Sequence, residues 1–505
     1  MIEKNCSAQK SNSVYLISIT ITLAVVLWGL ISPQTFGGFA KALNGGLTKY
    51  YGWGYMLTMN IFVIFCIAIA CSRFGSARLG GEDSRPEHSN ISWFAMLFSA
   101  GMGVGLVFYG AAEPLFHFGS TPLGAAPGSV QAARDAMQIS FFHWGLHPWA
   151  GYFVIAMPLA YYQFRYDTPG LISSIFIPLV GEKRVRGAFG KTVDVLAVFA
   201  TLAGITTSLG LGTLQLSSGL NTLFSVPKST LIQIIIIAVL ALFYTGSAAL
   251  GIEKGIKVVA NFNFFICLLL MALLCIVGPT LPIINSLMTG IGDFLSGLVK
   301  ESFTLAPYGG EYQSFLDSWT LYYWAWWIAW APFVGSFVAR ISRGRTVREF
   351  VAGVLIVPAL GSFTWFAIFG TSALHLEIVD KIAISASVLK DVSVGIFEMY
   401  RHYPLGQMMS AVMIVLIVTF FVTSANSATF VLAMYSAGGD LNPPKDKMVV
   451  WGVLMGALAV VLLLTGGLQN LQTVSLAAAM PFSIIMMCSC WSFVKALAKE
   501  EKAGH

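Results

Sequence analysis

The sequence predicts an all-α integral membrane protein with twelve transmembrane helices, on three observations. Of its 505 residues, 56% are hydrophobic and only 10% are charged, whereas soluble domains carry about 25% charged residues. The apolar runs are long and unbroken, as in residues 230–250, which favours helices of about 20 residues over alternating barrel strands. Lipid offers no hydrogen bonds, so each span must satisfy its own backbone groups, as a helix does.

Twelve apolar segments account for the predicted spans. The first follows a short charged start without a small-residue cleavage site, so we interpret it as a retained helix and not as a signal peptide. Most of the 29 Lys and Arg residues fall in the termini and the even-numbered loops, which predicts that both termini face the cytoplasm. The predicted spans cover residues 14–31, 52–72, 91–118, 137–164, 190–222, 229–250, 256–284, 318–340, 348–371, 405–435, 448–467 and 474–495.

These spans divide the chain into six parts. Apolar residues recur at helical spacing between the seventh and eighth spans, which predicts an amphipathic helix at the outer interface. Its apolar face is alternatively a subunit contact. The parts are a cytoplasmic N-terminus (1–13), two extra N-terminal helices (14–90), a first five-helix repeat (91–285), the connecting helix (286–317), a second five-helix repeat (318–495) and a short cytoplasmic tail (496–505).

The third span contains three alternating glycines, Gly101, Gly103 and Gly105. Each costs a helix interior about 1 kcal/mol relative to alanine, and their spacing does not form the four-residue stripe used in helix packing. We therefore predict a stretch that unwinds, which is tolerated at membrane depth where it lines a site. Backbone N–H groups freed at Gly103 to Gly105 would meet a substrate carboxylate, as helix N-termini do.

The eighth span carries Pro332, followed by Gly335. A proline inside a helix frees the carbonyl one turn before it, so this span is also predicted to be interrupted. Two interrupted helices five spans apart are typical of transporters built from two inverted repeats, with the substrate site between the repeats.

Aromatic residues gather inside the fourth and eighth spans, and residues 322–333 alone hold four tryptophans and two tyrosines. An interfacial belt would place them at span ends, and a plain core would favour residues without an indole N–H. Rings that converge on one cavity form a cage for a quaternary ammonium cation, worth roughly 0.5–2 kcal/mol per ring. Such a cage needs no buried carboxylate, which is costly in a membrane. Pro148, in the same part of the fourth span, is expected to bend the helix. The predicted cage residues are Trp144, Trp149, Tyr152 and Trp327.

Few ionisable residues lie within the spans. Glu113, Asp194 and Asp317 are each expected near a span end, where they cap helices or pair with loop charges. His143 and His147 flank Trp144. We expect each to make structural hydrogen bonds in the first place, and to carry protons only as the second interpretation. Neither histidine has an evident acidic partner, which argues against an intramembrane enzyme or lipid-binding protein and for a protein that is not an enzyme.

The tenth span places two hydroxyls, Thr423 and Ser424, in an otherwise apolar helix. Hard cations such as Na⁺ prefer oxygen ligands, so these residues are candidate Na⁺ ligands. The alternative, hydroxyls that bond back to their own helix, stays open. The fifth span offers further hydroxyls at Thr201, Thr206, Thr207 and Ser208.

Cysteine usage and charge exclude other classes. Six of the seven cysteines lie in apolar runs without metal-ligand spacing and are interpreted as small core residues. The isoelectric point near 8.8 suits positive cytoplasmic loops and not a nucleic-acid partner.

Four stretches carry a family resemblance: GMGVGLVFYGAAEPL, FHWGLHPWAGY, YWAWWIAWAPFVGSFVARISRGRT and FFVTSANSA. Over about residues 93–494 the chain resembles the betaine/carnitine/choline transporter family, most of all its Na⁺-coupled glycine betaine members. The resemblance implies a leucine-transporter-like fold with two inverted repeats, alternating access and homotrimers.

The resemblance also implies site residues. The four cage residues would form the substrate box, with the glycine stretch beside it and two further tryptophans along the path. The Na⁺-independent exchangers of the family carry an arginine where Asn263 aligns, so its absence here favours Na⁺ coupling. Ile205 stands where a threonine of the second Na⁺ site is common, which leaves the number of Na⁺ ions open. The implied residues are Trp326, Trp330, Met102, Gly103 and Gly105 for the substrate, Ser99, Met102, Phe420, Thr423 and Ser424 for one Na⁺, and Thr201, Tyr152 and Phe333 for a second.

Together these features predict a multi-pass symporter of the cell inner membrane. It would import a quaternary ammonium compatible solute, with glycine betaine as the expected substrate, for osmoprotection, with Na⁺ as coupling ion and no other cofactor. The alternative is a Na⁺-independent exchanger of carnitine-like or choline-like substrates.

Overall fold

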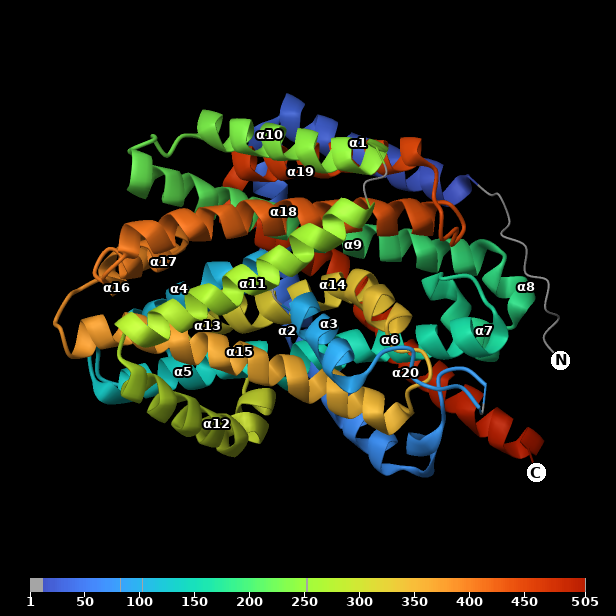
Figure 1. The fold of residues 1–505 in the computed structure, drawn as a ribbon. Helices are drawn as coiled ribbons and strands as arrows, with labels where there is room; N and C mark the ends of the chain where they lie inside the picture. Colours follow the sequence, from blue (N-terminus) through green and yellow to red (C-terminus); the bar gives the residue numbers. More distant parts are fainter. Residues whose placement is uncertain (1–11, 82, 102, 251–252, 505) are drawn as a thin grey trace.

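The computed structural model describes residues 12–81, 83–101, 103–250 and 253–504 of a protein built from helices. Across these residues the extended pairing is limited to one isolated bridge, Arg78 with Thr346. Most long helices run side by side, and α1 begins at the same end of the bundle at which α20 ends (Figure 1). The long helices are α1 (Ser13–Ile31), α2 (Pro33–Cys71), α3 (Asn90–Gly101), α4 (Val104–Ser120), α5 (Val130–Trp144), α6 (Leu146–Tyr166), α9 (Ala188–Phe224), α10 (Thr230–Leu250), α11 (Glu253–Val277), α12 (Thr280–Phe303), α14 (Leu321–Arg340), α15 (Val347–Ile378), α18 (Gly406–Ser436), α19 (Lys445–Gly466) and α20 (Leu468–Gly504).

The all-α membrane fold is confirmed, but the count of twelve spans is not. Among the described residues, ten helices are long and apolar enough to cross a membrane, or eleven if the broken pair α3 and α4 counts as one span. That number includes α12, which was predicted as an interfacial helix, and leaves out α6 and α14. The tryptophans, tyrosines and histidine of these two helices lower their hydropathy, because indole N–H, phenol and imidazole groups are polar.

Two predicted spans are broken, the third and the fourth. As predicted, the third is interrupted at the glycine stretch: α3 and α4 are bent by 68°, and Gly103 is extended (φ −156°, ψ −176°). The fourth is interrupted at Gly145, between α5 and α6, and not at Pro148, where a bend was expected. Pro148 instead lies in the first turn of α6, where its missing N–H leaves no hydrogen bond unmade.

The predicted interruption of the eighth span is wrong. Helix α14 runs without a break from Leu321 to Arg340, with Pro332 inside it. The Tyr435 hydroxyl of α18 donates to the Pro332 carbonyl at 2.7 Å and lies 2.6 Å from the Ser336 hydroxyl. These bonds join α18 to α14 at the level of the proline, whereas the carbonyl that the proline frees is that of Ile328, one turn earlier.

The outer helices expose apolar side chains. On α10, Leu242 and Phe243 are 76% and 63% exposed, and Phe265 of α11 is 61% exposed. A soluble protein rarely leaves such contiguous apolar surface in water. With the many apolar helices, these faces are those of a multi-pass membrane protein.

Helix α12 packs on the protein through one face, and it begins at Thr280 and not at residue 286, where the connecting helix was predicted. Its buried residues include Ile283, Gly290, Phe294 and Gly297, which form one stripe against α5 and α15. The opposite face exposes further apolar side chains, among them Met288 and Val299, so α12 has one face on the protein and one available to lipid or a subunit.

The loop after α14 is attached to the start of α3. The buried Arg345 side chain bonds to Asn90 Oδ1, donates to the His88 carbonyl at 2.6 Å and lies 4.5 Å from the Trp93 ring. The Trp93 indole N–H in turn donates to the Ser342 hydroxyl at 3.0 Å. These contacts join the first half of the broken third span to the helix that carries the aromatic segment.

Candidate functional site

The site lies where α6 and α14 pack together, next to the break between α5 and α6. All four predicted cage residues are buried, each between 3% and 5% exposed. None of them points outward into lipid, as an interfacial aromatic belt would.

Trp144 and Trp327 form one wall of the site. Their ring centroids are 4.9 Å apart with an interplanar angle of 73°, which is an edge-to-face contact. Trp327 also stacks on Trp326 at 4.8 Å and on Tyr323 at 5.7 Å. The tryptophan segment of α14 is therefore a stack of parallel rings that meets Trp144 edge-on.

Trp149 and Tyr152 form a second pair on α6. They lie one turn apart, and their rings meet at 5.4 Å with an angle of 88°. The break at Gly145 separates this pair from Trp144 along the chain, so α6 presents its two rings independently of α5.

The break also fixes the orientation of Trp327. Because α5 ends at Trp144, the His143 carbonyl has no partner one turn ahead in its own helix. The Trp327 indole N–H donates to this carbonyl at 3.2 Å. An interrupted helix thus supplies the acceptor that a buried indole needs.

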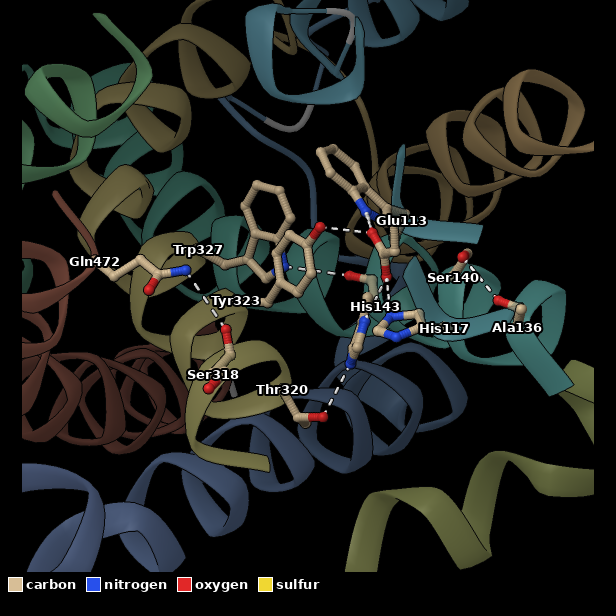
Figure 2. Close-up of polar contacts among 11 residues, drawn as sticks. Glu113, His117, Ala136, Ser140, His143, Ser318, Thr320, Tyr323, Trp327 and Gln472 are labelled. Atoms are coloured by element: carbon tan, nitrogen blue, oxygen red, sulfur yellow. Dashed lines mark hydrogen bonds and ion pairs between the residues drawn. The ribbon is translucent and has the colours of Figure 1, made fainter. Parts of the chain in front are cut away.

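Glu113 lies behind this wall, and its role was predicted wrongly. Its carboxylate is fully buried in the interior of α4 and not at a span end. Oε2 accepts hydrogen bonds from the Trp144 indole at 2.9 Å and from the Tyr323 hydroxyl at 2.5 Å. Oε1 lies 2.7 Å from His143 Nδ1. Figure 2 shows the carboxylate between Tyr323 and His143, and with the Trp144 bond it orients two rings of the site from outside.

His143 therefore has an acidic partner, contrary to the sequence prediction. Its other ring nitrogen, Nε2, lies 2.9 Å from the Thr320 hydroxyl. His147 is hydrogen-bonding structure as expected, with Nε2 3.1 Å from Asn60 Oδ1 and 3.2 Å from the Ser302 hydroxyl. The sequence carried a weak signal for a polar cluster here. Glu113 is an acid in a long apolar helix, and His117 follows it by one helical turn.

The glycine stretch meets the site at Gly105. A methyl carbon there would lie 2.4 Å from Trp326 Cη2 and 3.3 Å from Trp144 Cη2. Gly103 has no atom within 4 Å of such a carbon, so open space adjoins the extended backbone. Met102 lies outside the described residues.

We expect Gly105→Ala to displace Trp326 and Trp144, because the added carbon overlaps the Trp326 ring. Overpacking of this kind costs about 1–3 kcal/mol of folding stability, so the unfolding temperature should fall, and the displaced rings should raise the substrate concentration needed for half-maximal uptake. Uptake kinetics and thermal unfolding of the purified protein measure both effects. Gly38→Ala is the control, since Gly38 in α2 has nothing within 4 Å of the added carbon. Wild-type kinetics in Gly105→Ala would contradict the close approach.

The described residues predicted to bind the first Na⁺ lie on α3 and α18, and α11 contacts both of these helices. Thr423 Oγ1 donates within its own helix, 2.9 Å from the Thr419 carbonyl and 3.2 Å from the Phe420 carbonyl. Asn263 Nδ2 of α11 lies 3.5 Å from Thr423 Oγ1. The side-chain amide oxygen of Asn263, Oδ1, is buried without a hydrogen-bond partner among the described residues.

The end of α3 reaches the same region through Phe98, whose ring is 5.7 Å from Phe264 of α11. Ser99 follows Phe98 and Ser424 follows Thr423; both are half-buried. These Na⁺ assignments remain predictions.

The second predicted Na⁺ site has unpaired hydroxyls. Thr201 and Thr206 of α9 are buried, and their Oγ1 atoms have no partner among the described residues. Thr207, in contrast, bonds to the Leu471 carbonyl of α20 at 2.8 Å, and Ser208 to the Gly204 carbonyl of its own helix at 3.3 Å.

Helices α9 and α14 meet one turn after Thr201. A methyl carbon at Gly204 would lie 2.5 Å from Trp330 Cδ1, and the Trp326 indole donates to the Gly204 carbonyl at 3.3 Å. Phe333 packs on Trp330 at 5.5 Å. The predicted path residues Trp326 and Trp330 thus line the contact between α9 and α14.

Comparisons with known proteins agree with this site. Residues 13–502 match the family model of the betaine/carnitine/choline family transporters. The glycine betaine transporter OpuD of Bacillus subtilis is 45% identical over 97% of this chain and 95% of its own length. The ectoine/hydroxyectoine transporter of Virgibacillus pantothenticus is 42% identical over 98% of both chains. A glycine betaine transporter of Acinetobacter baylyi is 38% identical over 95% of this chain and 72% of its own length.

Proposed function

Because this chain belongs to the betaine/carnitine/choline family of transporters, we propose that it carries glycine betaine into the cell as a Na⁺ symporter. It is a transporter and not an enzyme. The observation that carries the substrate assignment is the buried contact between Trp144 and Trp327, beside the open backbone at Gly103.

The ring wall suits a trimethylammonium group. Indole faces attract a cation that has lost its water, by roughly 0.5–2 kcal/mol per ring. The Glu113 carboxylate accepts the Trp144 indole N–H, which pushes electron density toward the ring face and strengthens this attraction. The negative charge therefore acts through the indole, and the methyl groups of the substrate need not contact a carboxylate.

The carboxylate of betaine has a separate binding surface in this proposal. Helix α4 begins at Val104 after the extended Gly103, and the first N–H groups of a helix have no partner within it. Such groups bind anions well. A zwitterion would thus place its onium end on the aromatic rings and its carboxylate at the start of α4.

Ectoine is the second candidate substrate, because one close relative is named for its transport. Its ring carries a delocalised cation and a carboxylate, so both surfaces would serve it as well. Competition for labelled betaine uptake by unlabelled ectoine separates the two substrates.

Na⁺ coupling is supported by unpaired buried oxygens near the predicted ligands. The side-chain oxygen Oδ1 of Asn263 and the Thr201 and Thr206 hydroxyls are buried without hydrogen-bond partners in the described part of the chain, and hard cations take such oxygens as ligands. One positive charge moving inward gains about 2.3 kcal/mol per 100 mV of membrane potential. Because betaine is net neutral, one Na⁺ per substrate would already drive accumulation.

The packing of the helices supports two inverted repeats that move against each other. The two repeats can be matched element by element, and a contact within one match then has a counterpart in another. The first repeat, in chain order, is α3–α4, α5–α6, α9, α10 and α11, and its counterparts are α14, α15, α18, α19 and α20. Helix α14 packs on α6 as α15 packs on α4, and α20 packs on α9 as α11 packs on α18. The broken helix occurs in one repeat alone, since α14 is continuous. Homotrimers through α12, an inner-membrane location and cytoplasmic termini are part of the same proposal.

One uptake experiment in proteoliposomes tests the function. Labelled betaine uptake should depend on an inward Na⁺ gradient, saturate, and be inhibited by unlabelled betaine more strongly than by ectoine, choline or carnitine. Choline chloride cannot replace NaCl in this assay, because choline is itself one of the competing substrates. KCl is therefore the ionic control. Full uptake without Na⁺ would favour the exchanger instead, and preferential inhibition by ectoine would reassign the substrate.

A further inference from the structure

We propose that Glu113, His117 and His143 form a binding site for a divalent transition-metal ion of the Zn²⁺ type, behind the aromatic wall. One ligand atom from each residue lies within 4.8 Å of the other two, and all three side chains are fully buried. This site is separate from the predicted Na⁺ positions and takes a different class of ion.

Helical spacing brings the first two ligands together. Glu113 and His117 are four residues apart on α4 and share one face. His117 Nε2 lies 3.4 Å from Glu113 Oε1, although its geometry does not make a hydrogen bond, and both ring nitrogens of His117 are buried without a hydrogen-bond partner among the described residues. A buried imidazole with neither nitrogen bonded is costly, and a metal ion would remove that cost at the nitrogen that it binds.

The third ligand comes from α5. His143 Nδ1 is 2.7 Å from the same carboxylate oxygen. Two ligands of one tetrahedral Zn²⁺ lie roughly 3.3 Å apart, given bonds of about 2.0–2.2 Å. The contact to His117 already has this spacing, and the contact to His143 would open by about half an ångström as the metal replaces the shared proton.

The groups behind the ligands are those that metal sites use. A ligating histidine usually bonds through its other nitrogen to an oxygen that orients it, and His143 Nε2 has the Thr320 hydroxyl at 2.9 Å. The carboxylate is oriented in the same way, because its second oxygen is held by Trp144 and Tyr323. Figure 2 shows Oε1 turned toward both histidines and Oε2 turned toward Tyr323.

Two imidazole nitrogens and one carboxylate oxygen suit Zn²⁺, Co²⁺ or Ni²⁺ better than Na⁺ or Ca²⁺, which prefer oxygen alone. Phe315, a half-buried residue of the short helix α13 (Glu311–Phe315), packs on the site with its ring 5.4 Å from that of His117. Bound metal would join α4 to α5 and hold the carboxylate that orients Trp144, so metal should inhibit transport.

The test is Zn²⁺ titration of purified, chelator-stripped protein, read by calorimetry, with Co²⁺ absorption spectra as a second readout. The wild type should bind one Zn²⁺ per chain, and Co²⁺ should give the visible bands of a site with nitrogen ligands. His117→Phe keeps the ring shape among aromatic neighbours and should lower Zn²⁺ affinity at least about 100-fold, more than loss of an outer-shell partner does.

The matched control is His402→Phe, since His402 is an exposed loop histidine. It should bind Zn²⁺ as the wild type does. Absence of one-to-one binding in the wild type, unchanged affinity in His117→Phe, or loss of binding in His402→Phe would each overturn the proposal. Thermal unfolding verifies that His117→Phe is folded, and if it is not, His117→Gln replaces it in the same titration. None of these readouts depends on betaine transport, so the metal site and the proposed function fail separately.

Discussion

Replacing Trp327 with leucine is expected to reduce uptake of labelled glycine betaine by at least about 30-fold. The variant loses a ring face that contributes about 2 kcal/mol to holding a desolvated cation, and 1.4 kcal/mol corresponds to a factor of ten. It also loses the packing partner of Trp144 at 4.9 Å and the stack on Trp326. Uptake kinetics in proteoliposomes measure the effect, with protein amount normalised by immunoblot.

Two further variants separate the ring from its hydrogen bond. Trp327→Phe keeps an aromatic face but cannot donate to the His143 carbonyl, so it should retain more uptake than Trp327→Leu. Trp491→Leu is the surface control, because Trp491 is 67% exposed, and it should transport normally. If Trp327→Leu transports like the wild type, the aromatic wall does not bind the substrate.

Replacing Glu113 with alanine is expected to destabilise the protein by roughly 3 kcal/mol or more and to abolish uptake. The change leaves the Trp144 indole, the Tyr323 hydroxyl and His143 without their shared acceptor. Each buried group left unpaired costs about 1–3 kcal/mol. A lower unfolding temperature in detergent and loss of betaine uptake should therefore appear together.

Glu113→Gln distinguishes the charge from the shape of this side chain. Its amide oxygen can still accept from Trp144 and Tyr323, so the fold should survive. The loss of the negative charge behind the indole should weaken substrate binding while the unfolding temperature stays near that of the wild type. Glu311→Ala, on the exposed start of α13, is the control for removal of an acid. A stable, fully active Glu113→Ala would show that the carboxylate does not orient the site.

Much of the architecture followed from local chemistry in the sequence. Low charge and long apolar runs indicate membrane helices, because lipid cannot satisfy a backbone outside a helix or barrel. The alternating glycines indicated the break between α3 and α4 because glycine is costly in a helix. The aromatic residues inside spans indicated a ring wall because a buried indole needs a partner.

Two of the predictions that failed concerned prolines inside predicted spans. Pro332 was expected to break α14, but α14 is continuous through it, and α18 packs beside it with Tyr435 bonded to the Pro332 carbonyl. Pro148 was expected to bend the fourth span, but Gly145 already ends α5 before it. In both cases the effect of a proline depended on where the helix starts and on what packs beside it.

The sequence by itself determined that this protein is a bundle of membrane helices with a glycine break and buried aromatic rings, because composition and spacing act within one helix. Only the tertiary structure decided what Glu113 does. Its carboxylate gains its partners from α5 and α14, which are 30 and 210 residues away in the chain. A buried charge is stable only where several donors converge on it, and that convergence arises from packing between helices that no single segment encodes.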